Sequence, residues 1–165
     1  MSSSDRRAFL TLLAGLPALA ACGFEPVYGT GGAAEALRGT VRAADPKNRD
    51  EYHLVTRFEQ RLGRPQTPVY DLSYKLTVDT EALAINANDD ALRYHLLGKV
   101  EFTLTDRRSG AVALSGAVDS YTGYSATGTT VSTLTAEQDA HERLMVILAD
   151  QVVTRLLGAA GGLTP

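Results

Sequence analysis

Residues 69–79 read Val-Tyr-Asp-Leu-Ser-Tyr-Lys-Leu-Thr-Val-Asp, and from Tyr70 onward their side chains alternate between apolar and polar. The even positions up to Val78 are apolar, whereas the odd positions from Asp71 to Asp79 are polar. Because successive side chains of a β-strand point to opposite faces, this period of two predicts a strand with one buried face and one exposed face.

Two further stretches repeat the alternation with the same parity. Their apolar or small even positions are Tyr94, Leu96, Gly98, Val100, Phe102 and Leu104, followed by Val112, Leu114, Gly116 and Val118. Short polar segments separate the three stretches, at Asn86–Asp90 and at Asp106–Gly110, and the second ends in glycine as a hairpin loop requires. Short connections join antiparallel neighbours, so the three strands are predicted to form a meander.

Helical periodicity flanks this meander on both sides. After a short strand expected at about Leu37–Ala43, apolar residues at a spacing of three to four predict a helix from Asp50 that ends at Gly63. A longer helix is predicted near the C-terminus, where Leu144, Leu148, Val152 and Leu156 step by four.

The ends of the longer helix are also predicted. The capping-box spacing of Thr135 and Gln138 marks its start, and Gly158 fits a C-terminal cap. The element order is therefore β-α-β-β-β-α. We expect an α+β fold, a single largely antiparallel sheet of about four strands with two helices packed on one face.

The N-terminus has the pattern of a secretory leader. Charged residues precede an apolar run that is too short to span a membrane, and the run ends at Leu-Ala-Ala-Cys, which resembles a bacterial lipobox with Cys22 as the acylated residue. Residues 1–21 are predicted to be a signal peptide, and the adjacent Arg6 and Arg7 leave both twin-arginine and ordinary Sec export open. Residues 22–36 are expected to be a lipidated, flexible tether, 37–158 the domain, and 159–165 a disordered tail without core residues.

Composition and motifs exclude several functions. The chain has 16 basic and 19 acidic residues, a net charge of −3, which argues against nucleic-acid binding. A lone cysteine cannot form an internal disulfide or a thiolate zinc site. The histidines at 53, 95 and 141 lie on three predicted elements, and no catalytic motif is complete. We therefore expect no enzyme activity, no metal, and no cofactor apart from covalent acyl and diacylglyceryl groups on Cys22.

Four basic residues are candidate ligands for phosphate groups. Arg93 and Lys99 fall on or near the polar side of the second long strand, and Arg107 and Arg108 lie in the hairpin that follows. Arginine binds phosphate oxygens with two parallel hydrogen bonds, which suits phosphorylated sugars. Asp106 and Glu101 lie nearby in the sequence, so an ordinary solvated surface is the alternative interpretation.

The segment Cys22-Gly23-Phe24-Glu25-Pro26-Val27-Tyr28-Gly29 resembles the mature N-terminus of the alphaproteobacterial LptE family of lipopolysaccharide-assembly lipoproteins. The element order is similar over residues 22–158, as are Glu137-Gln138-Asp139 and Ala149-Asp150-Gln151 in the last helix. Some family members carry basic residues in the first hairpin and before the last helix, where this sequence has Asn86–Asp90 and the uncharged Val131–Leu134.

The resemblance implies a non-enzymatic lipoprotein of the outer membrane that faces the periplasm. It implies a β-barrel partner, LptD, which the protein would plug and help to assemble as lipopolysaccharide is inserted into the outer leaflet. Lipopolysaccharide is then the phosphorylated ligand expected at Arg93, Lys99, Arg107 and Arg108. The alternatives are an auxiliary lipoprotein of an ABC-type lipid transporter, or a periplasmic hydrolase with His95 or His141 beside a serine and an acid.

Overall fold

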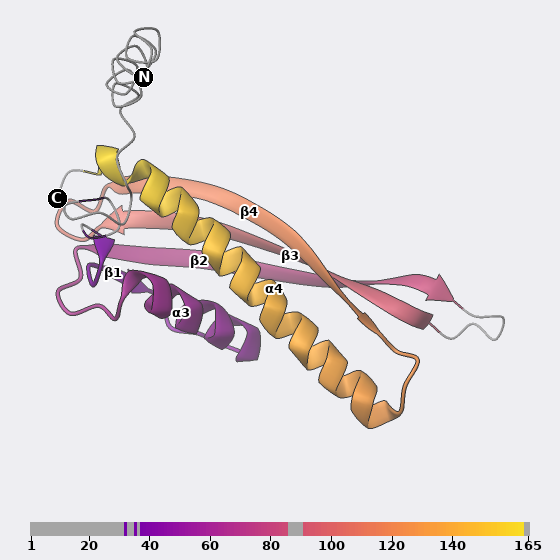
Figure 1. Ribbon diagram of the computed structural model, residues 1–165. Coiled ribbons are helices and arrows are strands. Elements are labelled where there is room, and N and C mark those ends of the chain that lie inside the picture. The colour runs from indigo at the N-terminus through magenta and orange to yellow at the C-terminus, as the bar shows by residue number, and fades with distance from the viewer. Residues whose placement is uncertain (1–31, 33–34, 36, 86–90, 164–165) are drawn as a thin grey trace, which may run out of the picture.

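The computed structural model describes residues 32, 35, 37–85 and 91–163. Their elements follow the predicted order, and Figure 1 shows them as one sheet crossed by a long helix. The elements are β1 (Val41–Ala43), α3 (Arg49–Leu62), β2 (Tyr70–Ile85), β3 (Ala91–Asp106), β4 (Val112–Ser125), α4 (Thr130–Ala159) and the short 3₁₀ helix η1 (Ala160–Gly162). The predicted leader, Cys22, most of the tether and the loop Asn86–Asp90 lie outside the described residues.

The four strands form one sheet in the order β1-β2-β3-β4. Strands β2, β3 and β4 pair antiparallel, as the short connections predict, whereas β1 pairs parallel to β2 because α3 carries the chain back between them. The mixed but mainly antiparallel α+β fold confirms the predicted class.

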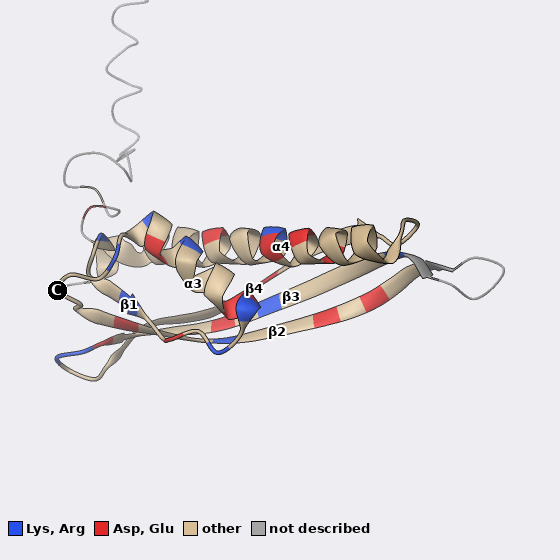
Figure 2. Cartoon of the chain, turned by 90° about the horizontal axis from the view of Figure 1, so that it is seen from below, with Lys and Arg blue, Asp and Glu red and all other residues tan. Residues whose placement is uncertain are grey.

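The parity predicted for β2 and β3 is confirmed. The even-numbered face, called the covered face below, is buried or half-buried from Tyr70 to Val78 and from Tyr94 to Leu104. The odd-numbered face of β2 is exposed throughout from Asp71 to Glu81, and we call this side of the sheet the open face. Figure 2 shows both helices on one side of the strands, so no other helix or strand of the described residues covers the open face.

Val112 departs from the predicted parity. Leu104 pairs with Leu114, but Thr105 pairs with Val112, so Ala113 is an extra residue in β4. A bulge of this kind turns the side chain that follows it to the other face. Val112 therefore lies on the open side and is 62% exposed.

The first predicted strand is shorter than expected. Leu37 is buried but precedes the strand, and the amide of Thr40 donates to the carbonyl of Leu37 across a tight turn. Gly39 occupies this turn with φ of 71°, a left-handed conformation that glycine adopts without strain. Only Val41–Ala43 then pair with β2.

Helix α3 begins where the side chain of Asn48 accepts a hydrogen bond from the backbone N–H of Glu51. Its buried side chains, Leu54, Phe58 and Leu62, face the sheet. The helix ends at Gly63, as predicted, with φ of 79°.

Helix α4 is longer than predicted at both ends. Its N-terminal cap is Thr129, whose hydroxyl accepts from the N–H of Ser132, and Thr135 lies one turn inside the helix, where it donates to the carbonyl of Val131. The predicted cap at Thr135 is wrong because no glycine or proline separates the two threonines, so the earlier cap at Thr129 adds six residues to the helix.

The C-terminal cap at Gly158 is wrong for a similar reason. Alanine favours the helical conformation, and Ala159 and Ala160 carry the chain past the glycine into η1. Ala160 is buried and Leu163 packs against the core, so the core extends beyond residue 158.

One stripe of α4 packs against the sheet, and its closest approach is at Gly98. A Cβ atom at this position would lie 2.7 Å from Leu148 Cδ1 and 2.9 Å from Leu144 Cδ2. Although α4 is long and apolar enough to cross a membrane, its buried stripe makes it the core helix of this domain. The stripe comprises Ala140, Leu144, Met145, Leu148, Ala149, Val152, Val153, Leu156 and Leu157.

Polar contacts join the helices across their shared border. Asp150 of α4 accepts from Arg57 of α3 through two parallel bonds, Nε–Oδ1 of 2.9 Å and Nη2–Oδ2 of 2.8 Å. Nearer the N-termini of the two helices, His141 Nδ1 of α4 lies 2.9 Å from Asp50 Oδ2 of α3. Both pairs are part-buried, and they link α3 to α4 at two separate points.

Candidate binding surface

The open face is a ladder of polar side chains arranged in cross-strand rows. In one row Lys75 of β2 lies opposite Glu101 of β3, and in the next Lys99 of β3 lies between Thr77 and Asp119. Lys99 Nζ is 2.7 Å from Glu101 Oε1. This hydrogen bond and the charge of Lys99 lower the pKa of the Glu101 carboxyl. The face thus carries both signs of charge in an interleaved pattern.

The four predicted basic residues do not form one patch. Arg93 lies near the start of β3, opposite Ser125, whereas Arg107 and Arg108 lie in the hairpin beyond its end. At about 3.3 Å per residue, the length of β3 separates these sites by roughly 40 Å. Lys99 lies between them and is already bound to Glu101. The residues therefore mark three separate positions.

The hairpin residues Arg107 and Arg108 have different surroundings. Arg107 Nε lies 3.2 Å from Asp71 Oδ2, which ties the hairpin to β2. Arg108 contributes its backbone N–H to Asp106 Oδ1 at 2.8 Å, and the same oxygen accepts from the N–H of Ser109. These backbone bonds lower the pKa of the Asp106 carboxyl. The guanidinium of Arg108 is exposed at the tip of the hairpin.

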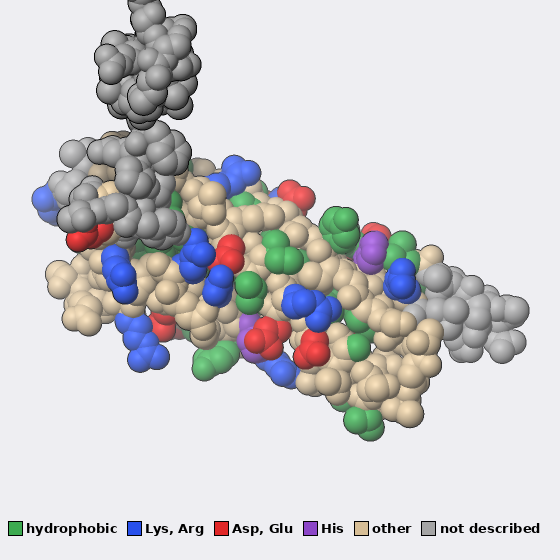
Figure 3. All heavy atoms as spheres, in the orientation of Figure 1, with side chains coloured by type: hydrophobic (Ala, Val, Ile, Leu, Met, Phe, Trp, Pro, Cys, Tyr) green, Lys and Arg blue, Asp and Glu red, His purple; other side chains and the backbone are tan. Residues whose placement is uncertain are grey.

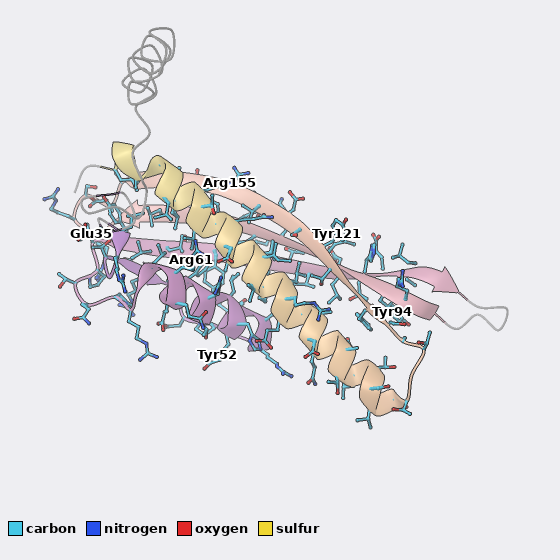
Figure 4. All side chains as sticks on the ribbon, in the orientation of Figure 1. Glu35, Tyr52, Arg61, Tyr94, Tyr121 and Arg155 are labelled. Atoms are coloured by element: carbon cyan, nitrogen blue, oxygen red, sulfur yellow. The ribbon has the colours of Figure 1, made fainter. Side chains whose placement is uncertain are left out.

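An aromatic and apolar cluster, which sequence reasoning missed, interrupts the polar ladder. Tyr121 is 65% exposed on the open face, and its ring lies 5.4 Å from that of His95. Leu97, paired with Tyr121, is 37% exposed. Figure 4 labels Tyr121 on β4 and Tyr94 on β3. The missed signal is Leu97, an apolar residue at an odd position of an otherwise alternating strand.

The covered face has its own aromatic pair. Tyr94 and Tyr124 stack with ring centroids 5.2 Å apart and an angle of 17° between their planes. Burial, together with the nearby charge of Glu137, raises the pKa of the Tyr124 hydroxyl. The pair continues the core toward the far ends of β3 and β4.

A groove of about 340 Å³ lies between β1 and α3. Its lining combines apolar side chains such as Val41 and Phe58 with the rim residues Tyr52, Glu59 and Arg64. On this helix-covered side of the molecule, basic and acidic side chains are interspersed, as Figure 3 shows. The charged side chains that line the groove, Arg42, Asp45, Glu59 and Arg64, are two basic and two acidic residues, so the lining carries no excess of either charge.

The histidines do not assemble a catalytic group. His141 lines a shallow groove with Asp50 and His53, and no serine is among the residues lining it. His95 lies on the opposite side of the sheet, beside Tyr121. Within the described ranges there is also no cluster of three His, Cys, Asp or Glu residues that could hold a metal ion.

The family model for LptE, described as lipopolysaccharide-assembly, matches residues 38–156, which span all four strands and most of α4. The chain belongs to the LptE family. This confirms the family inferred from the N-terminal motif and the element order. LptE proteins are non-enzymatic lipoproteins of lipopolysaccharide assembly, associated with the outer membrane.

Solved structures share the fold. A lipoprotein from Caulobacter crescentus CB15 matches with a TM-score of 0.64 and 23% identity, over 79% of this chain and 97% of that one. The rare lipoprotein B of Shewanella oneidensis matches with a TM-score of 0.55 and 12% identity, over 74% and 96% of the two chains. A minor lipoprotein of Acinetobacter baumannii matches with a TM-score of 0.54 and 15% identity, over 72% and 89%. A comparison with curated protein sequences gave no match.

Proposed function

We propose that this LptE-family protein is an outer-membrane lipoprotein that plugs and helps to assemble the LptD β-barrel, which inserts lipopolysaccharide into the outer leaflet. The observation that carries this proposal is the open face, a mainly polar surface that runs along the three main strands and is interrupted by Leu97 and Tyr121. The lumen of a large outer-membrane barrel is polar and needs a polar object to fill it. Interleaved Lys75, Lys99, Glu101 and Asp119 suit such a wall.

The membrane attachment in this proposal rests on the lipobox. The leader 1–21 would be removed, and acyl chains on Cys22 would hold the protein in the inner leaflet of the outer membrane, facing the periplasm. Two or three acyl chains give stable anchoring, at about 0.8 kcal/mol per buried methylene. Residues 22–36 would give the domain enough slack to enter the barrel.

Replacing Cys22 tests this attachment. Cys22→Ala should release the full chain from the membrane fraction into the periplasm, because the acyl chains supply the anchor. Immunoblotting of washed membranes measures the release, and Ser2→Ala, far from the lipobox, is the control. Retention of the alanine variant in outer membranes after a high-salt wash would contradict the anchor.

Lipopolysaccharide contact is proposed at Arg93, Lys99, Arg107 and Arg108. Because these residues lie at three separate positions, they would engage different phosphate groups or different molecules instead of clamping one phosphate. Arg93 and Arg108 are exposed and form no ion pair within the described residues, so they are the stronger candidates. Arg108→Ala should weaken capture of purified lipopolysaccharide more than Lys99→Ala, whose ammonium is bound to Glu101.

The deciding experiment for the proposed function is purification of the affinity-tagged full chain from native membranes. Recovery of a heat-resistant β-barrel identified as LptD supports the plug role. Recovery of an ATPase complex would instead support an auxiliary role in an ABC-type lipid transporter and would overturn the proposal.

A further inference from the structure

The two edges of the sheet differ in how they are protected from pairing. Strand β1 has three residues, carries the exposed Arg42 at its centre and is soon followed by Pro46. Strand β4 has fourteen residues, no proline and a single charged side chain, Asp119. Natural sheets usually shorten or charge their edge strands, because an unpaired row of N–H and C=O groups accepts another strand. The β4 edge lacks these protections.

The geometry of β4 is regular along most of its length. From Leu114 to Ser125 it pairs with β3 residue by residue, and the bulge is confined to its start. Among the described residues, no strand pairs with its outer edge, and one side chain, Arg143, reaches a β4 carbonyl at Gly123. A segment of about six to ten residues could therefore continue the sheet there.

Asp119 indicates the charge of the segment that would fit. Its neighbour across the sheet is Lys99, but Lys99 is bound to Glu101. Asp119 is exposed and forms no ion pair within the described part of the chain. A lysine or arginine opposite Asp119 on an added strand would supply the missing partner.

The same residue disfavours a second copy of this chain as the occupant. A two-fold pairing of β4 with β4 near the middle of the strand brings the two Asp119 carboxylates to opposite or diagonal positions. Like charges at such positions destabilise a strand pair. Charge complementarity thus favours a different polypeptide.

Tyr121 indicates a second feature of the segment. It lies two residues beyond Asp119, on the same face, and its ring is 65% exposed beside Leu97. An apolar side chain opposite Tyr121 would bury this ring. The fitting strand therefore has a basic and an apolar residue separated by one position.

We propose that the outer edge of β4 binds an extended segment of the barrel partner by strand addition, with a basic residue opposite Asp119 and an apolar residue opposite Tyr121. This inference rests on the proposed function. The segment belongs to a loop or to a chain extension of the partner, because the backbone groups of a closed barrel are already paired with each other. The backbone bonds give affinity, and the two side chains give specificity.

Hydrogen exchange tests the backbone bonds directly. In the purified complex of the full lipoprotein with its barrel, every second amide of β4 between Ser115 and Gly123, those whose N–H points away from β3, should exchange about tenfold or more slowly than in the lipoprotein alone. The amides of β1 should show little change, which makes β1 the internal control.

Substitution tests the specificity. Asp119→Lys should reduce recovery of the barrel about tenfold, and Tyr121→Ala should reduce it by a smaller factor. The matched control is Asp45→Lys, which makes the same charge reversal at an exposed residue that follows β1, at the opposite edge of the sheet and outside the open face. Circular dichroism checks that the variants fold.

The outcomes separate the two proposals. If the barrel is recovered but the amides of β4 exchange as fast as in the lipoprotein alone, strand addition is overturned and the plug role stands. Failure to recover any barrel overturns both. Concentration-dependent protection of β4 in the lipoprotein alone would show that a second copy occupies the edge, which also overturns the inference.

Discussion

The covered and open faces of this sheet belong to the same three strands, yet apolar burial dominates on the covered face and exposed polar and charged side chains dominate on the open face. On the covered face, Leu96, Val100 and Leu104 are fully buried under α4 and α3. On the open face, the neighbouring positions carry exposed charges, of which Lys99 and Glu101 pair with each other. Stability should therefore depend on the covered face, and binding on the open face.

Leu96 and Leu97 offer the sharpest test because they are consecutive residues with the same side chain on opposite faces. Leu96 is 0% exposed and Leu97 is 37% exposed. Leu96→Ala should lower the free energy of unfolding by about 2–5 kcal/mol, because it leaves a cavity under α4. Leu97→Ala should lower it by less than about 1 kcal/mol. Urea denaturation measures both, and equal costs would show that the faces are not distinct.

Gly98 tests the closeness of α4 to the covered face. Gly98→Val should lower the free energy of unfolding by about 1–3 kcal/mol, because the new side chain meets the fully buried Leu144 and Leu148. Lys99→Val, at the next position on the open face, is the control and should have a much smaller effect. A Gly98→Val protein as stable as the parent would mean that α4 does not pack this closely.

The bidentate pair between Asp150 and Arg57 tests the polar border of the covered side. Asp150→Asn keeps the size of the side chain and removes its charge. Since both side chains are about one-third exposed, we expect a loss of about 1 kcal/mol that decreases at high salt. Thermal melts at two salt concentrations measure it, and a loss that does not change with salt would point to packing instead of charge.

The smallest effect is expected from the Lys99–Glu101 pair on the open face. Because the folded state lowers the pKa of Glu101, the pair stabilises the fold above the ordinary glutamate pKa, and this contribution is lost as the pH falls through the lowered value. Urea midpoints of the parent and of Lys99→Met should therefore differ slightly at neutral pH and converge in acid. A difference that persists in acid would assign the effect to the lysine stem.

The sequence predicted most of this architecture because alternation and helical spacing both report burial. The even positions from Tyr70 to Leu104 were sufficient to orient the sheet. The bulge at Ala113 was not predictable, since a single extra residue does not change the amino-acid composition of the strand in a recognisable way. The start of α4 was misplaced because Thr129 and Thr135 are equally suitable caps and only the tertiary context selects between them.

The candidate surface was predicted less completely. Arg93, Arg107 and Arg108 lie on or beside the same strand in the sequence. Because a strand is extended, residues at its two ends are far apart in space. The ion pair of Arg107 with Asp71 joins residues far apart in the sequence, which periodicity does not reveal. The exposed Tyr121 could be found only as an apolar exception to the alternation.

The parallel placement of β1 has a consequence for the reach of the protein. Figure 1 shows β1 and η1 at the same end of the sheet, so the chain enters and leaves the described domain on one side. From that end, the sixteen residues of β2 give a contour of roughly 50 Å. A bilayer with its headgroups is about 40–45 Å thick. A domain that is anchored at one leaflet with its strands along the membrane normal is thus as long as the bilayer is thick.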